Sequence, residues 1–196
     1  MGTRREFLGT MAATSVVLPA SVSLASTGKT PDRLHIHKAI YDSSFVECAV
    51  FGRAAAHCGI RVHEIGDDIS DLWYGDLHHR WRNTADTIAG LTSHRSLVYL
   101  EQLARTYGRR VVVRGTHRRA GSMIEHELTG PAYLIDDAIS QNRDAPWSWQ
   151  LGVAASHWSP GAHRTATVVT TTSSSALSDG RWEQLASWVI APRAGV

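Results

Sequence analysis

Between residues 34 and 114 the sequence alternates between short apolar runs and segments with the periodicity of an amphipathic helix. Runs typical of strands cover 34–41, 60–65, 87–91 and 109–114, and helical segments cover 44–57, 70–82 and 94–107. Gly59 and Gly108 follow two of the helical segments, where a helix commonly ends. Strands that alternate with helices pair in parallel, with the helices packed on the sheet. The alternation therefore predicts an α/β protein.

The predicted fold class is a single domain with a mostly parallel, three-layer α/β/α sheet. This arrangement resembles a flavodoxin-like or Rossmann-like half domain. The segment after the first predicted strand reads YDSSF, whereas dinucleotide-binding proteins of that type have a glycine-rich loop there. A nucleotide bound in the usual dinucleotide manner is therefore not expected, and no cofactor is predicted for this chain.

The alternation stops near residue 115, and the C-terminal half predicts an antiparallel extension of the sheet. Segments 111–118 and 122–128 flank Ala120-Gly121 and predict a β-hairpin. Segment 131–140 predicts a short helix, and 147–155 and 165–172 predict two further strands. Ser178 or Asp179 is placed to cap a last amphipathic segment, RWEQLASWVI. No domain boundary divides residues 34–196.

The N-terminus has the features of an export signal. Residues 1–26 have a charged start, a mildly apolar run and small residues, with Ser23 and Ala25 placed for cleavage. The segment TRREFLG contains Arg4 and Arg5 followed by Phe7 and Leu8, and it resembles the bacterial twin-arginine (Tat) signal. The resemblance implies a cleaved Tat signal over 1–26, a polar leader over 27–33, the Tat translocase as a partner and a periplasmic location. Proteins with such signals usually cross the membrane folded, holding a cofactor or bound to a partner.

Charge and hydropathy exclude two classes of function. The chain has 20 Lys and Arg against 18 Asp and Glu, and these charges are scattered along the sequence. Proteins that bind nucleic acid or a lipid surface usually carry a denser basic patch. No apolar stretch is long enough to span a membrane in the mature chain. We therefore expect a soluble exported domain without nucleic-acid partners.

Polar residues follow the predicted strands, at the edge where parallel α/β sheets commonly bind ligands. They could form a catalytic or ligand-binding site, although helix capping and turn formation equally explain Asp42, Ser43 and Ser93. The candidates are Asp42, Ser43, Asp67, Asp68, Thr92, Ser93, His94 and His117.

Histidines and cysteines raise the question of a metal site. The chain has 11 histidines, and His35 and His37 would lie on the same face of a strand, as two ligands of a zinc or copper ion. No established metal-binding motif is present, so scattered surface histidines remain the alternative. Cys48 and Cys58 lie in one predicted helix, about 15 Å apart, which is too far for a disulfide between them. We expect both to be buried thiols.

Tryptophan is abundant, with 7 residues in the chain. Trp147 and Trp149 would share one face of the predicted strand 147–155, and Trp158 lies in a loop. Such an aromatic surface suits a protein partner, because tryptophan often anchors interfaces, although packing in the core is the alternative.

Two functions remain open. The chain could be an accessory subunit that folds with a larger enzyme and escorts it through the Tat system; that partner could carry flavin, haem or a metal, and small Tat-bearing subunits of periplasmic flavin dehydrogenases set a precedent. Alternatively, it could be a stand-alone ligand-binding protein or enzyme with its site at the carboxyl ends of the parallel strands. The absence of catalytic motifs favours the accessory subunit.

Overall fold

A computed structural model describes residues 35–66, 68–140, 145–173 and 182–193. These residues belong to one unit of the chain, Arg33–Val196. The predicted signal with Arg4, Arg5, Phe7, Leu8, Ser23 and Ala25 lies outside the described residues, as do the leader and the candidates Asp67, Ser178 and Asp179. In the described part of the chain, no helix is long and apolar enough to cross a membrane.

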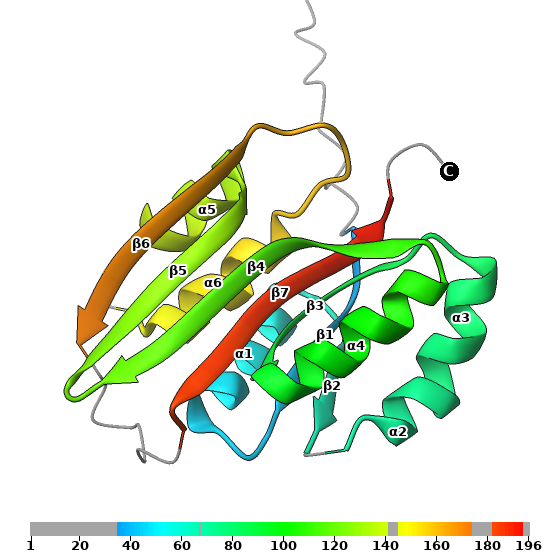
Figure 1. The fold of residues 1–196 in the computed structure, drawn as a ribbon, viewed down its shortest axis with the longest axis horizontal. Coiled ribbons are helices and arrows are strands. Elements are labelled where there is room, and N and C mark those ends of the chain that lie inside the picture. The colour runs from blue at the N-terminus through cyan, green and yellow to red at the C-terminus, as the bar shows by residue number, and fades with distance from the viewer. Residues whose placement is uncertain (1–34, 67, 141–144, 174–181, 194–196) are drawn as a thin grey trace, which may run out of the picture. The chain divides into compact units, whose positions relative to one another are not determined.

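Seven strands form one mixed sheet in the order β2-β1-β3-β7-β4-β5-β6 (Figure 1). The strands are β1 (Ile36–Asp42), β2 (Val62–Ile65), β3 (Thr87–Ser93), β4 (Arg109–Ala120), β5 (Met123–Pro131), β6 (Thr165–Ser173) and β7 (Gln184–Pro192). Only the pairs β1–β2 and β1–β3 are parallel, and the other four pairs are antiparallel. The α/β class is confirmed, but a mostly parallel sheet is wrong.

Helices pack on both faces of the sheet. They are α1 (Val46–His57), α2 (Ser70–Leu72), the π-helix η1 (Trp73–Leu77), α3 (His78–Asn83), α4 (His94–Thr106), α5 (Ala132–Ser140) and α6 (Trp147–Ser156). One buried cluster joins the sheet to α1, α5 and α6, and a second joins its other face to η1, α3 and α4. Successive strand residues separate accordingly: Ala39 belongs to the first cluster and Ile40 to the second.

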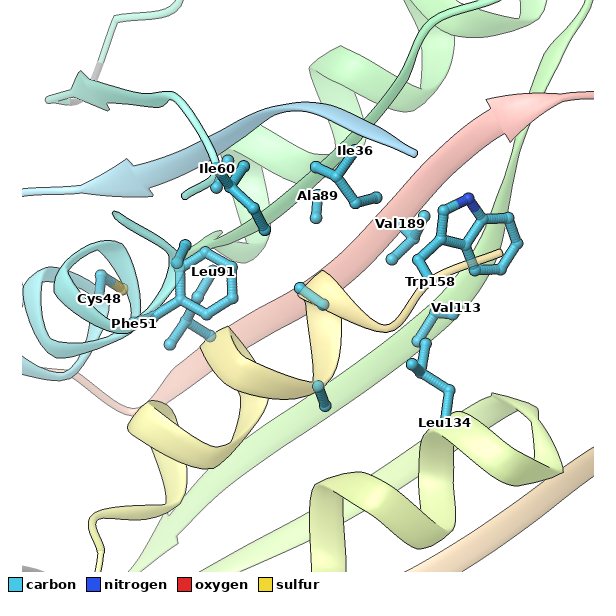
Figure 2. Packing of buried hydrophobic residues seen from close by; sticks show 14 of the residues in the cluster. Ile36, Cys48, Phe51, Ile60, Ala89, Leu91, Val113, Leu134, Trp158 and Val189 are labelled. Carbon is cyan, nitrogen blue, oxygen red and sulfur yellow. The ribbon is translucent and has the colours of Figure 1, made fainter. Parts of the chain in front are cut away.

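The first cluster lies between the sheet and α1, α5 and α6. Figure 2 shows Ile36, Ala89 and Val189 of three neighbouring strands facing the same side as Phe51 of α1 and Leu134 of α5. Trp158, which follows α6, is 5% exposed and is a member of this cluster (Figure 2). It is therefore part of the hydrophobic core.

The predicted strand 147–155 is wrong, because this segment is helix α6. Its apolar residues fit either structure by periodicity alone, so the packing partner decides. At Gly152 a Cβ atom would lie 2.6 Å from both the Ala54 Cβ and the Phe51 carbonyl oxygen, so α6 approaches α1 closely. Small residues on both helices make that approach possible, and Trp147 and Trp149 consequently do not share a strand face.

The last amphipathic segment is strand β7, and not a helix. β7 lies between β3 and β4, and its residues from Leu185 to Ala191 are all buried. A strand that is covered on both faces is apolar at successive positions and loses the alternation of a half-exposed strand. Because β7 is apolar at successive positions, its sequence shows no period of two. By entering between β3 and β4, β7 also makes the central part of the sheet antiparallel.

Other local predictions are confirmed. Gly121, with a φ of 61°, lies in the turn between β4 and β5, which pair as the predicted hairpin. The Ser93 side chain accepts a hydrogen bond from the Ser96 N–H and caps α4. Cys48 and Cys58 are free thiols. Cys48 is buried as predicted, and burial raises its pKa, whereas the prediction of a buried thiol is wrong for Cys58, which is half-buried.

Candidate functional site

The predicted site at the carboxyl ends of the parallel strands is assembled in part. β1 and β3 are neighbours, so Asp42 and Ser43 at the end of β1 lie at the same edge as Thr92 and Ser93 at the end of β3. The chain leaves these two strands in opposite directions, toward β2 and toward β4. This is the arrangement in which open α/β sheets commonly bind ligands.

Structural hydrogen bonds occupy polar atoms at this edge. The Asp42 Oδ1 accepts from the Ser44 N–H at 3.0 Å, in the turn before α1. The buried Thr92 hydroxyl accepts from the indole N–H of Trp188 at 3.1 Å. Asp68 accepts from the Ser70 N–H at the start of α2. Helix α1 itself begins after Phe45, whose side chain makes no capping bond.

His94 and His117 do not come together with the other candidates as one group. His94 is exposed at the first position of α4. His117 belongs to β4, which continues to Ala120, so Thr116 and His117 lie within a strand and not after one. His117 is completely buried and faces His126 of the neighbouring strand β5.

The two histidines form the centre of a hydrogen-bonded chain of four side chains. The His117 Nδ1 and His126 Nδ1 lie 2.8 Å apart. The His117 Nε2 lies 2.9 Å from the Ser187 Oγ of β7, and the His126 Nε2 lies 2.7 Å from the Thr172 Oγ1 of β6. Four adjacent strands therefore contribute one member each, in the order β7, β4, β5 and β6.

Both imidazoles are neutral at pH 7. Burial lowers the pKa of His126 to about 4. Burial also lowers the pKa of His117 well below its usual value, and the neighbouring His126 lowers it further. Removal from water disfavours the charged form of each ring, and a second positive charge at this distance would be repelled. Each ring therefore has one N–H donor and one nitrogen acceptor.

Trp147, the first residue of α6, covers the histidine pair. Its ring centroid lies 4.5 Å from that of His117 and 4.9 Å from that of His126. Its ring centroid lies 6.3 Å from that of Trp182. Trp147 is half-buried, so one part of its ring packs on the core and the remainder is accessible.

A cavity of about 540 Å³ lies beside the pair, between strands β4–β6 and helices α5 and α6. Its volume is within the usual range for small-molecule sites. His117, His126 and Thr172 line it, and Leu128, Ile139 and Leu151 supply apolar wall. The other lining residues are Ala138, Ala145, Pro146, Trp147, Gln150, Thr170, Thr171 and Ser173. These described lining residues supply apolar, hydroxyl, amide and imidazole groups, and none of them is Asp, Glu, Lys or Arg.

Sequence reasoning missed His126, Thr172 and Ser187 as partners of His117. The hairpin prediction named no register, and the observed register, which pairs Ala120 with Met123, is what places His117 opposite His126. Thr172 and Ser187 come from strands far along the chain, and their positions depend on the pairing of β6 with β5 and of β7 with β4.

The predicted metal ligands have other surroundings. His35 is exposed before β1, whereas the His37 ring lies 2.6 Å from the Arg61 guanidinium and 3.9 Å from the Asp86 carboxylate. Burial lowers the pKa of His37. Among the described residues, no three or more His, Cys, Asp or Glu side chains form a group that could hold a metal ion.

The three candidate partner-binding tryptophans occupy different environments. Trp147 covers the histidine pair, Trp158 lies in the core, and Trp149 is half-buried with its ring 5.8 Å from that of His57. The aromatic surface for a partner stays a prediction.

Comparison of the chain with protein-family models, with curated proteins and with solved structures gives no match.

Proposed function

We propose that this chain is an exported protein that binds a small uncharged molecule in the cavity between β4–β6 and α5–α6. The observation that carries the proposal is the buried His117–His126 pair on the wall of that cavity. Two imidazoles in a core cost stability unless every polar atom has a partner, and apolar residues would fill the same space without that cost. A binding role explains why such a network faces a cavity of this size.

The lining favours an uncharged ligand with both apolar and polar groups. The histidines are neutral at pH 7, and the described lining residues include no side chain of fixed charge, so among them an ion would lose its hydration without gaining a counter-charge. The indole of Trp147 and the chains of Leu128 and Leu151 suit an apolar ring or alkyl group. The Thr172 hydroxyl can form a hydrogen bond with its polar group, whereas both ring nitrogens of His117 and His126 are already used within the network.

The location of this activity follows from the N-terminal resemblance. The segment with Arg4 and Arg5 before Phe7 and Leu8 supports export by the Tat translocase and a periplasmic site of action. No cofactor is proposed for the chain itself. In this proposal the chain folds before export and binds its ligand in the periplasm.

The test is to fill the cavity. The Thr170→Trp variant places an indole in the cavity, because Thr170 lines it, whereas Val169→Trp is a matched control, since Val169 is 64% exposed and absent from the lining. Both proteins are purified from the native periplasm and analysed by native mass spectrometry. The wild type and Val169→Trp are expected to carry the same small molecule, and Thr170→Trp is expected to lose it, with an affinity at least tenfold lower (about 1.4 kcal/mol). Equal occupancy in the two variants contradicts the proposal.

The escort of a larger redox enzyme is a second candidate, and the edge strand β6 favours it. β6 ends the sheet, and its sequence TATVVTTTS has no charge, proline or bulge in its pairing with β5. Edge strands without such features readily pair with a strand of another protein. In this proposal the partner, which could carry flavin, haem or a metal, adds a strand beside Val169.

Co-purification from the periplasm tests this second candidate. Val169→Lys is expected to release a stoichiometric larger partner while unfolding stability changes by less than about 0.5 kcal/mol, since the site is exposed. Tyr99→Lys, on the exposed surface of α4, is the control and should retain the partner. A wild-type protein that elutes alone contradicts the escort role.

A further inference from the structure

We propose that the hydrogen bonds in the side-chain network of Ser187, His117, His126 and Thr172 all point from Ser187 toward the cavity. The Thr172 hydroxyl then donates a hydrogen bond to the ligand. This inference rests on the proposed function and specifies its ligand: an uncharged molecule that presents a hydrogen-bond acceptor, such as a carbonyl or ether oxygen, to Thr172. The network acts as a single unit because each member's donor or acceptor role fixes that of the next.

The short distance between the two histidines links their tautomers. A hydrogen bond between the His117 Nδ1 and the His126 Nδ1, at 2.8 Å, requires one proton between them. A neutral imidazole has a single N–H, so the ring that donates through Nδ1 has a bare Nε2. The other ring accepts at Nδ1 and must be protonated at Nε2. The pair therefore has two states, which place the outer N–H toward Ser187 or toward Thr172.

The surroundings of Ser187 select between these states. Ser187 is 5% exposed, and its hydroxyl makes one hydrogen bond among the described residues, with the His117 Nε2. If that nitrogen carried the proton, the Ser187 Oγ would accept, and its own proton would be buried without an acceptor. If the nitrogen is bare, Ser187 donates to it and every polar atom is satisfied. A buried donor without a partner shifts such an equilibrium by about tenfold or more.

The far end of the network lies in a different environment. Thr172 is half-exposed and lines the cavity, so its hydroxyl proton can pass to water or to a ligand. With Ser187 donating to His117, the His117 Nδ1–H donates to His126, and the His126 Nε2–H donates to the Thr172 Oγ1 at 2.7 Å. The Thr172 proton is then directed away from His126. The buried Ser187 thus determines that Thr172, at the cavity, requires a hydrogen-bond acceptor.

Nuclear magnetic resonance of the full-length protein labelled with ¹⁵N-histidine tests the polarity without any ligand. Two-bond proton–nitrogen spectra distinguish a protonated from a bare ring nitrogen. We expect His117 protonated at Nδ1 and His126 protonated at Nε2. The reverse assignment, or equal populations in the wild type, overturns the proposal.

A pair of variants at Ser187 shows whether its hydroxyl sets the polarity. Ser187→Ala removes the donor, and the ratio of the two tautomers is expected to move toward unity by about tenfold. Ser187→Thr retains a hydroxyl, and an adjoining gap of about 30 Å³ lined by Ser187 can take part of the added methyl group. It should restore the wild-type tautomers. An unchanged ratio in Ser187→Ala overturns the proposal.

Two probes of similar size then test ligand selection. Acetophenone offers a carbonyl acceptor only, and indole offers an N–H donor only. We expect the wild type to bind acetophenone more tightly, and Thr172→Val to lower that affinity about five- to tenfold while indole is unaffected. Equal affinities, or no loss in Thr172→Val, overturn the proposal. If the tautomers are as expected but the wild-type protein carries no small molecule in native mass spectrometry, the proposed function and the ligand class fail while the polarity of the network stands.

Discussion

β3 and β6 show how differently the two halves of the sheet are used. In β3, six of seven residues are buried, whereas β6 alternates between exposed and half-buried residues along its whole length. β3 has a parallel neighbour on one side and helices on both faces, while β6 is an edge strand. The sheet is therefore covered on both faces around β3 and less completely covered at β6.

The difference explains where a ligand can bind. Around β1 and β3 the polar side chains make structural hydrogen bonds. Asp42 accepts one in the turn before α1, Thr92 accepts one from the Trp188 indole, and Ser93 caps α4. Around β5 and β6 two short helices cover one face incompletely and leave a cavity of about 540 Å³. We infer that the parallel half mainly stabilises the fold and that the antiparallel half provides the binding site.

Two tryptophans give the sharpest contrast between the well-covered region around β3 and the region of the cavity. Trp188 of β7, opposite Gly90 of β3, is 2% exposed in the cluster with η1, α3 and α4, whereas Trp147 is half-buried beside the cavity. Trp188→Ala is expected to lower the free energy of unfolding by about 4 kcal/mol, and Trp147→Ala by less than half of that, because fewer packing contacts are lost. Urea titration measures both. A larger loss for Trp147 would reverse the assignment of the stabilising half.

The histidine pair should make the antiparallel half sensitive to acid. The pKa of His126 is about 4 in the folded protein and near 6.5 when unfolded, so between these values the unfolded chain binds more protons. The contribution of neutral His126 to the free energy of unfolding is therefore fully present above about pH 6.5 and is lost as the pH falls toward 4. His126 alone contributes a loss of about 2 kcal/mol between pH 7 and pH 5.

Unfolding by urea at the two pH values measures this loss. The matched variant is His126→Asn, which keeps a hydrogen-bonding side chain but does not titrate in this range. It should lose less stability than the wild type over the same change of pH. An identical dependence on pH in both proteins would show that the pKa of His126 is the same in the folded and unfolded states.

The cap of α4 should produce the smallest effect, confined to the parallel half. Ser93→Ala removes the acceptor for the Ser96 N–H and is expected to cost about 1 kcal/mol, whereas Ser93→Asn should restore most of it. Neither variant should change ligand occupancy in the cavity. Loss of the ligand without loss of stability would indicate that the ligand binds at the carboxyl ends of β1 and β3.

Local signals predicted those parts of the fold in which they agree with the surroundings. Helix α4 has a capping serine, an apolar face and a glycine after its end, and it forms close to the predicted limits. The β4–β5 hairpin was predicted from Ala120-Gly121. Segment 147–155 and the segment RWEQLASWVI were assigned to the wrong structure, because an apolar run that is buried on several sides has no diagnostic period.

The candidate site was predicted less well than the fold. His117 was singled out, but its group was not, since the sequence placed it after a strand together with Asp42 and Ser93. The hairpin was predicted, but its register, which places His126 opposite His117, was not. Ser187 and Thr172 were not predicted either, because no local pattern specifies which strand lies beside β4 or β5.

The sequence by itself determined the α/β class, the hairpin, the ends of α4 and the resemblance of residues 1–26 to an export signal, since these depend on short-range chemistry along the chain. The tertiary structure decided the position of β7 between β3 and β4, the conversion of 147–156 to a helix, and the alignment of Ser187, His117, His126 and Thr172. Strand order and helix packing arise from burial between segments far apart in the chain, so no single segment encodes them.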